Sequence, residues 1–92
     1  MLSQRLQEFL STFCNPETEP EYVADVLHGP GGQYYKDWLP QELFIAVQAR
    51  ELNPATMTTL TGVYFGDQQQ VGDWLRTVWP MWFTEPYPGS AA

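Results

Sequence analysis

Proline and glycine interrupt this sequence so often that no regular element can run far. The 92 residues include eight prolines and seven glycines, which lie between residues 16 and 89. Proline lacks the N–H that a helix or sheet needs, and the residue before it avoids the helical conformation. Gly29-Pro30-Gly31-Gly32, for example, cannot continue a helix. The chain is therefore expected to fold as short elements joined by turns.

Between these breaks, apolar residues recur at helical spacing. We predict helices over residues 3–13, 20–27, 41–52, 55–65 and 68–79, and one helical turn within 33–39. Ser3 and Asn53 are suited to N-cap positions, and Pro20 and Pro54 to first turns. Pro80 is expected to end or kink the last helix.

Residues 55–65 are ambiguous, because their threonines, valine and aromatics also favour strands. Helix is preferred, since the capping signal is local and no other strong strand exists to pair with. The predicted fold is all-α: a compact bundle of four to five short helices. One helical domain is expected over residues 1–83, followed by an irregular tail, 84–92, rich in proline and aromatic residues.

The charge balance excludes one class of partner. The net charge is −7, and the only basic residues are Arg5, Lys36, Arg50 and Arg76. Direct nucleic-acid binding needs lysine and arginine to displace counterions from phosphates, so it is not expected. Anionic membrane surfaces are disfavoured for the same reason. An acidic surface suits a basic protein partner, or it serves only solubility.

The sequence also bears on the compartment. No apolar run approaches the roughly 20 residues needed to span a bilayer, and residues 1–8 do not resemble a secretory signal. Cys14 is the single cysteine, so no internal disulfide can form. We expect a cytoplasmic protein.

Groups for catalysis are scarce. Cys14 and the single histidine, His28, form a weak candidate dyad; Glu21 and Asp25 share a helix face but fit a solvated surface better. Zinc, iron–sulfur and calcium patterns are missing. The sequence therefore predicts a protein that is not an enzyme, with no cofactor and no metal site.

Two groups of residues are candidates for binding another protein. One is an aromatic run near the C-terminus and the other is an acidic segment: Trp79, Trp82, Phe83 and Tyr87, and Glu17, Glu19, Glu21 and Asp25. Exposed clustered aromatics mark interaction sites, and carboxylates around them steer a basic partner. The competing interpretations are that the tail folds back so that its aromatics cover the core, and that the acids are solvated surface.

The preferred hypothesis is a small acidic protein-binding module, of the adaptor, chaperone or inhibitor (immunity) type, with an aromatic-centred interface rimmed by acids. One alternative is a self-associating structural or assembly subunit, for example a homodimer or a phage component, since residues 41–52 carry a wide apolar stripe. A second alternative is an acidic mimic that blocks a nucleic-acid-binding protein. No motif is specific enough to indicate a family.

Overall fold

The computed structural model describes residues 2–88, and every regular element within that range is a helix. The helices are α1 (Gln4–Phe13), α2 (Pro20–His28), α3 (Gly32–Lys36), α4 (Leu39–Gln48), α5 (Pro54–Thr61) and α6 (Gln68–Phe83). The predicted all-α fold is confirmed. Of the tail predicted at 84–92, the part from 89 to 92 lies outside the described residues.

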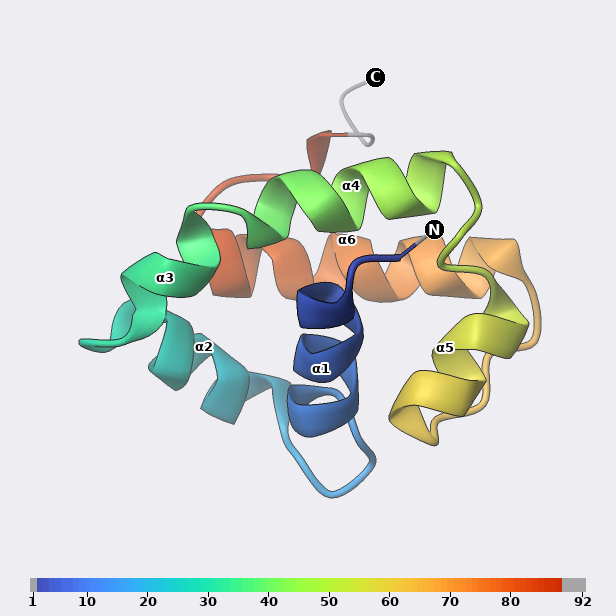
Figure 1. Cartoon of the computed structure of the whole chain (residues 1–92), viewed down its shortest axis with the longest axis horizontal. Helices are drawn as coiled ribbons and strands as arrows, with labels where there is room; N and C mark the ends of the chain where they lie inside the picture. Colours follow the sequence, from blue (N-terminus) through green and yellow to red (C-terminus); the bar gives the residue numbers. More distant parts are fainter. Residues whose placement is uncertain (1, 89–92) are drawn as a thin grey trace.

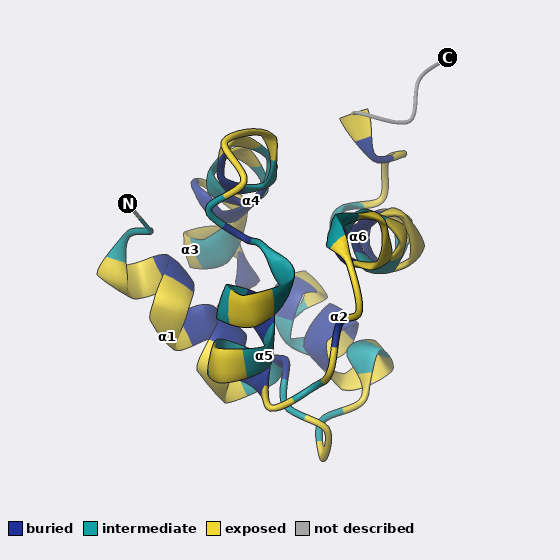
Figure 2. Ribbon diagram, turned by 90° about the vertical axis from the view of Figure 1, so that its right-hand side faces the viewer, coloured by how far each residue is buried: buried dark blue, intermediate teal, exposed yellow. Residues whose placement is uncertain are grey.

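Helices α4 and α6 run across the molecule in the same direction of the view, and α1 runs crosswise to them (Figure 1). Helix α1 packs against α4 and α5, whereas α2 packs against α3 and α6. Helices α2 and α3 therefore lie at one end of the molecule and α5 at the other. Figure 2 shows that the helices turn their buried sides inward, which is the arrangement expected of amphipathic helices.

One hydrophobic core joins these helices. Leucines that are almost inaccessible to solvent come from α1, α2, α4 and α6: Leu6, Leu10, Leu27, Leu39, Leu43 and Leu75. The largest fully buried side chains are those of Trp79 and Trp82. A chain this short can build a core because each large aromatic buries about 150–250 Å².

The predicted N-caps of α1 and α5 are confirmed. The Ser3 hydroxyl accepts a hydrogen bond from the Leu6 N–H at 3.2 Å, and the Asn53 side-chain Oδ1 accepts one from the Thr56 N–H at 2.9 Å. Each cap satisfies an N–H group that has no partner within its helix. Helix α5 is shorter than predicted, because Gly62 turns the chain with φ at +74° and 63–65 are not helical.

Helix α4 also ends earlier than predicted, at Gln48 rather than at residue 52. The Glu51 N–H donates to the Ala46 carbonyl at 2.9 Å, and the Arg50 N–H donates to the Val47 carbonyl at 3.0 Å. This is the Schellman arrangement that closes many helices. Arg50 adopts φ of +60° in the position where glycine is usual, at a cost of about 1–2 kcal/mol.

Helix α6 continues past Pro80, whereas the sequence predicted an end or a kink there. Proline inside a helix costs about 3 kcal/mol. Burying Trp82 in the turn that follows Pro80 offsets this, since about 150–250 Å² at about 25 cal/mol per Å² is worth roughly 4–6 kcal/mol. Pro80 and Arg76 lie on the exposed side of α6, where water can solvate the Arg76 carbonyl.

Candidate functional site

The aromatic residues predicted to form an exposed interface lie largely in the core. Trp79 and Trp82 are each 1% exposed, Tyr87 is 4% exposed, and Phe83 is half-buried. The expectation that they form an exposed patch is therefore corrected. The competing interpretation, in which the end of the chain folds back over the core, describes their positions.

Contacts from three directions hold these rings inside. The Trp82 indole N–H donates to the Pro20 carbonyl at 3.1 Å, and its ring meets Phe9 of α1 edge-on at 5.8 Å. The Trp79 ring contacts Tyr87 at 5.1 Å, and Tyr87 in turn contacts Phe44 of α4 at 5.8 Å. The end of α6 is thereby fastened to α1 and α2, and the segment after it to α4.

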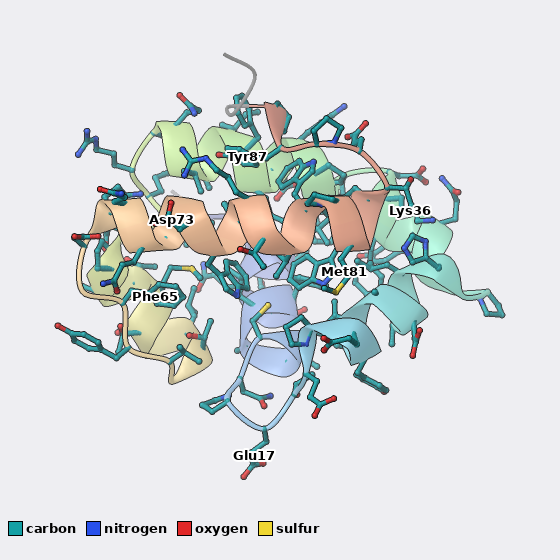
Figure 3. The ribbon with its side chains drawn as sticks, turned by 180° about the vertical axis from the view of Figure 1, so that it is seen from behind. Glu17, Lys36, Phe65, Asp73, Met81 and Tyr87 are labelled. Atoms are coloured by element: carbon teal, nitrogen blue, oxygen red, sulfur yellow. The ribbon has the colours of Figure 1, made fainter. Side chains whose placement is uncertain are left out.

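The predicted acidic residues are all exposed. Glu17 projects from the loop between α1 and α2 (Figure 3), and Glu19, Glu21 and Asp25 belong to α2 or its N-cap. The hydrogen bond from the Trp82 indole to the Pro20 carbonyl places the start of α2 next to this buried ring. Because the four acids are exposed whereas Trp79, Trp82 and Tyr87 are buried, the two predicted groups do not form one surface.

An aromatic pocket that the sequence did not point to lies between α1 and α3. This α1–α3 aromatic pocket has a volume of about 210 Å³. It is lined by Arg5, Glu8, Phe9, Thr12, Phe13, Tyr34, Tyr35 and Trp38. Helix α1 supplies the phenylalanines from one face, and α3 with the residue before α4 supplies the tyrosines and the tryptophan.

The rings of the pocket form a continuous set of edge contacts. Tyr34 lies 5.1 Å from Tyr35 and 6.0 Å from Trp38, and Tyr35 lies 5.9 Å from Phe13, all between ring centroids. Tyr34 is 59% exposed, whereas Trp38 is buried and its indole N–H has no hydrogen-bond partner. The pocket therefore offers a partner the accessible ring of Tyr34 next to the buried ring of Trp38.

Arg5 fixes one wall of this pocket. Its guanidinium lies 4.5 Å from the centroid of the Trp38 ring and pairs with the carboxylate of Glu42, the Arg5 Nε donating at 2.7 Å. Ser3 donates to the same carboxylate. Partial burial acts to raise the pKa of Glu42, but the bonds from Ser3 and Arg5 and the charge of Arg5 bring it below its usual value.

One local feature of the sequence points to this pocket. Tyr34, Tyr35 and Trp38 fall within five residues, directly after the Gly-Pro loop. A five-residue helix such as α3 presents too little buried face to hide both of its tyrosine rings, and Tyr34 stays exposed. Predicting their partners on α1 would still have required the tertiary structure.

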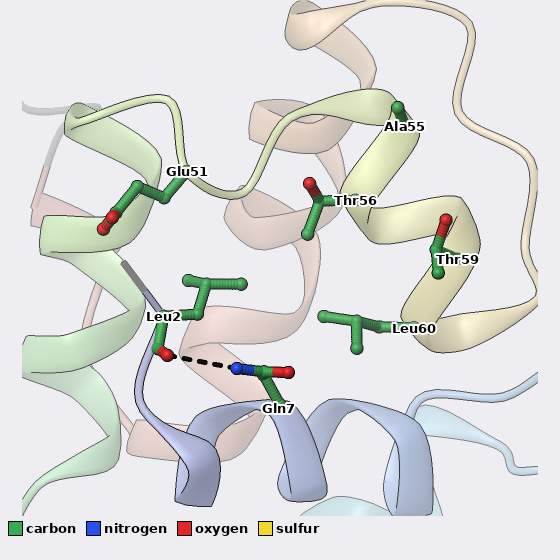
Figure 4. A pocket seen from close by; sticks show the side chains of 7 residues that line it. All are labelled: Leu2, Gln7, Glu51, Ala55, Thr56, Thr59 and Leu60. Carbon is green, nitrogen blue, oxygen red and sulfur yellow. Dashed lines mark hydrogen bonds between the residues drawn. The ribbon is translucent and has the colours of Figure 1, made fainter.

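A second hollow lies between α1 and α5 (Figure 4). It has a volume of about 480 Å³ and is lined by Leu2, Gln7, Glu51, Ala55, Thr56, Thr59 and Leu60. The Gln7 side chain donates to the Leu2 carbonyl at 3.1 Å, so this amide is already engaged. Glu51 is the one ionisable side chain in the lining, so the α1–α5 hollow offers little for acid–base chemistry.

The candidate catalytic dyad is not assembled. Burial raises the pKa of the Cys14 thiol to about 12, whereas a reactive cysteine has a lowered pKa. The His28 Nε2 donates to the Met81 carbonyl at 3.0 Å, and no histidine lines the hollow beside Cys14. Over residues 2–88, no group of three or more His, Cys, Asp or Glu side chains is placed to hold a metal ion.

The fold and this pocket define a small all-helical protein with an aromatic surface pocket. Comparison with models of protein families, with curated proteins and with solved structures gave no match. Among the described helices, none is long and apolar enough to cross a membrane.

Proposed function

We propose that this chain is a non-enzymatic protein-binding module that receives a basic side chain of a partner protein in the α1–α3 aromatic pocket. The observation that carries the proposal is the pairing of an accessible aromatic ring, Tyr34, with a carboxylate, Glu8, in one lining. Aromatic faces attract cations, and a nearby carboxylate strengthens the preference for lysine or arginine.

The protein itself supplies an example of this recognition. Arg5 already stacks on the Trp38 ring while Glu42 neutralises it, so a cation and an aromatic face meet within the same lining. Tyr34 and Tyr35 present further rings beside it. A lysine or arginine from a partner would meet the same combination of ring and carboxylate.

The rest of the surface favours a basic partner as well. The net charge of −7 attracts cationic proteins and speeds their encounter. Tyr and Trp are favoured as interface anchors because they bury large area with few rotatable bonds. The single buried cysteine suits a reducing compartment, and we place the module in the cytoplasm.

Substitution of Tyr34 tests this proposal. Tyr34→Ala removes the accessible ring, and Tyr64→Ala is the matched control, because Tyr64 is 79% exposed and does not line the pocket. Each variant and the parent protein would be titrated with a labelled lysine-rich peptide and with a glutamate-rich counterpart. Affinity capture from cells that contain the protein would then be quantified for each.

We expect Tyr34→Ala to weaken binding of the lysine-rich peptide about tenfold, since truncating an interface residue that contributes to affinity costs more than about 1 kcal/mol, and to lose captured proteins that Tyr64→Ala retains. Equal binding and equal capture by the two variants would remove the pocket from the interface. Preference for the glutamate-rich peptide would contradict the basic partner.

Self-association is a second candidate, favoured by one observation. Ile45 on α4 is 62% exposed and borders a hollow that also includes Leu2, Leu6 and Ala46. The hollow also includes Ser3, Glu42 and Glu51, so a two-fold dimer would pair an apolar centre with polar groups at its edge. Light scattering would give a dimer mass for the parent and for Gln41→Glu, and a monomer mass for Ile45→Glu. A monomeric parent protein would exclude this candidate.

A further inference from the structure

Two of the four basic residues of this acidic chain line a single cleft between the end of α4 and the start of α6. This α4–α6 cleft has a volume of about 410 Å³. Its lining contains no carboxylate and consists of Val47, Gln48, Arg50, Gln68, Gln69, Gly72, Arg76 and Tyr87. The chain has eleven acidic and four basic residues, so a cleft lined by two arginines and no carboxylate differs from the rest of the molecule.

The donors in the cleft come from side chains and from a helix terminus. The amides of Gln48, Gln68 and Gln69 add N–H donors to the two guanidinium groups. The Gln68 amide already donates to the Leu52 carbonyl at 3.1 Å, and the Gln48 side chain is hydrogen-bonded to Tyr87, but each glutamine amide carries two N–H groups. Gln68 and Gln69 also form the first turn of α6, where backbone N–H groups have no acceptor within the helix and the helix dipole is positive. Asp67 caps the turn through the Gln70 N–H at 2.9 Å, which leaves the first two N–H groups.

Arg76 is held along the wall of the cleft. A Cβ at Gly72 would lie 3.3 Å from the Arg76 Nη1, so the missing side chain gives the guanidinium room. The centroid of the Tyr87 ring lies 5.8 Å from the Arg76 Cζ. The ion pair of Arg76 with Asp73, at 3.0 Å, is exposed at both partners, so an incoming anion can compete for the guanidinium.

Arg50 adopts a backbone conformation that is more favourable for glycine than for arginine. Its φ of +60° closes α4, and a glycine there would adopt this angle without strain. The sequence therefore keeps an arginine at the edge of the cleft against the local conformational preference. Residues with strained backbone angles cluster at active sites and ligand-binding sites.

We propose that the α4–α6 cleft binds a phosphate group, with Arg50 and Arg76 as charge partners and the start of α6 and the glutamine amides as further donors. Arginine engages a phosphate through two parallel hydrogen bonds, and a helix N-terminus is a natural phosphate site. The source is a free phosphate compound or a phosphorylated side chain of a protein. This cleft is separate in residues from the α1–α3 aromatic pocket, so either proposal stands without the other.

The test is an NMR titration of the full chain at constant ionic strength. The probes are inorganic phosphate, phosphoserine, a short phosphoserine peptide and the same peptide unphosphorylated. Saturable shifts are expected at the side-chain amides of Gln48, Gln68 and Gln69 and at the Gly72 N–H. The phosphopeptide binding more tightly than the free compounds would identify a protein source, and the reverse order a small phosphate compound.

Three variants make the result specific. Arg50→Gln and Arg76→Gln should each weaken binding about tenfold or more, because each loses charge-assisted hydrogen bonds. Lys36→Gln removes the same charge from an exposed position outside the cleft and should leave binding unchanged. Arg50→Gly should raise the melting temperature by relieving the strained angle while still weakening phosphate binding.

The proposal fails if no probe gives a saturable shift, or if Lys36→Gln weakens binding as much as Arg76→Gln does, since phosphate would then respond to overall charge alone. It also fails if Arg50→Gly binds phosphate as the parent does. Folding of each variant is checked by circular dichroism, and the exposed Arg50 provides a substitution that leaves the core intact.

Discussion

Glu42 links the first residues of the chain to the aromatic pocket. Its carboxylate accepts hydrogen bonds from Ser3 and from Arg5, and Arg5 in turn covers Trp38. Ser3 also caps α1, so one carboxylate bears on the helix start and on the pocket wall. Removing this charge is expected to loosen both together.

The effect of Glu42→Gln should therefore depend on pH. The pKa of Glu42 is lowered in the folded protein, so its stabilising contribution is present above the unfolded value, about 4.3, and is lost as pH falls through the folded value. Arg5 is half exposed, which limits the loss at pH 7 to about 1 kcal/mol. Urea unfolding at pH 7 and near pH 3 measures it; a difference that does not shrink in acid contradicts the linkage.

Among the elements, α6 bears the largest share of the core aromatics. Trp79 and Trp82 are fully buried, and Trp74 meets Trp82 edge-on at 5.6 Å. Residues beyond Pro80 stay helical because this side of the helix has neighbours on α1 and α2. The end of α6 is thus held by tertiary contacts rather than by its local sequence.

Trp82→Ala is expected to destabilise the protein by about 3–5 kcal/mol, the usual cost of removing a buried aromatic ring. It also removes the indole N–H that donates to the Pro20 carbonyl. Urea unfolding measures the loss, with Tyr64→Ala as an exposed aromatic control expected to change stability by less than about 0.5 kcal/mol. A free energy of unfolding that Trp82→Ala leaves nearly unchanged would contradict the buried position and support the surface interface that the sequence suggested.

Pro80→Ala should have the opposite sign. Alanine restores the N–H that can donate to the Arg76 carbonyl, and removes the helix cost of about 3 kcal/mol. Because proline also restricts the unfolded chain, an effect of about 0.4–1 kcal/mol, the net gain is expected to be roughly 2 kcal/mol. An unchanged or lower melting temperature would mean that Pro80 fits α6 without the usual penalty.

The comparison of sequence with structure is clearest at these helices. Local signals at Ser3 and Asn53 were sufficient to place helix starts, because a cap acts within three residues. The ends of α4 and α6 were misplaced, since Arg50 closes α4 with a backbone angle unusual for arginine, and buried tryptophans outweigh Pro80. The pocket around Tyr34 was missed because its walls come from helices distant in sequence.

At the scale of the whole molecule, charge is unevenly distributed. Exposed carboxylates cluster on α2 and the loop before it, whereas Arg50 and Arg76 share the α4–α6 cleft. A molecule with net charge −7 repels anions at long range, so a phosphate is attracted only once it is close to the cleft. A basic partner is attracted from a distance and should arrive over the acidic side.

That difference leads to a kinetic prediction for the basic partner. Raising the salt concentration from about 0.02 to 0.2 M shortens the Debye length from roughly 20 to 7 Å. The association rate with a lysine-rich peptide should then fall at least about tenfold, while the dissociation rate changes little. Stopped-flow fluorescence over this range measures both rates, and a salt-independent association rate would exclude steering.

Removing single carboxylates at different places distinguishes steering by the acidic segment from the effect of net charge alone. Glu19→Gln and Glu21→Gln should each slow association at low salt. Asp67→Asn removes the same charge at the start of α6 and keeps an effective helix cap, so it should slow association less. The contribution of the net charge does not depend on which carboxylate is removed, whereas the field of a localised cluster weakens with distance from it. Equal slowing by all three variants would therefore assign the attraction to the total charge. Glu17, Glu19, Glu21 and Asp25 would then be solvated surface.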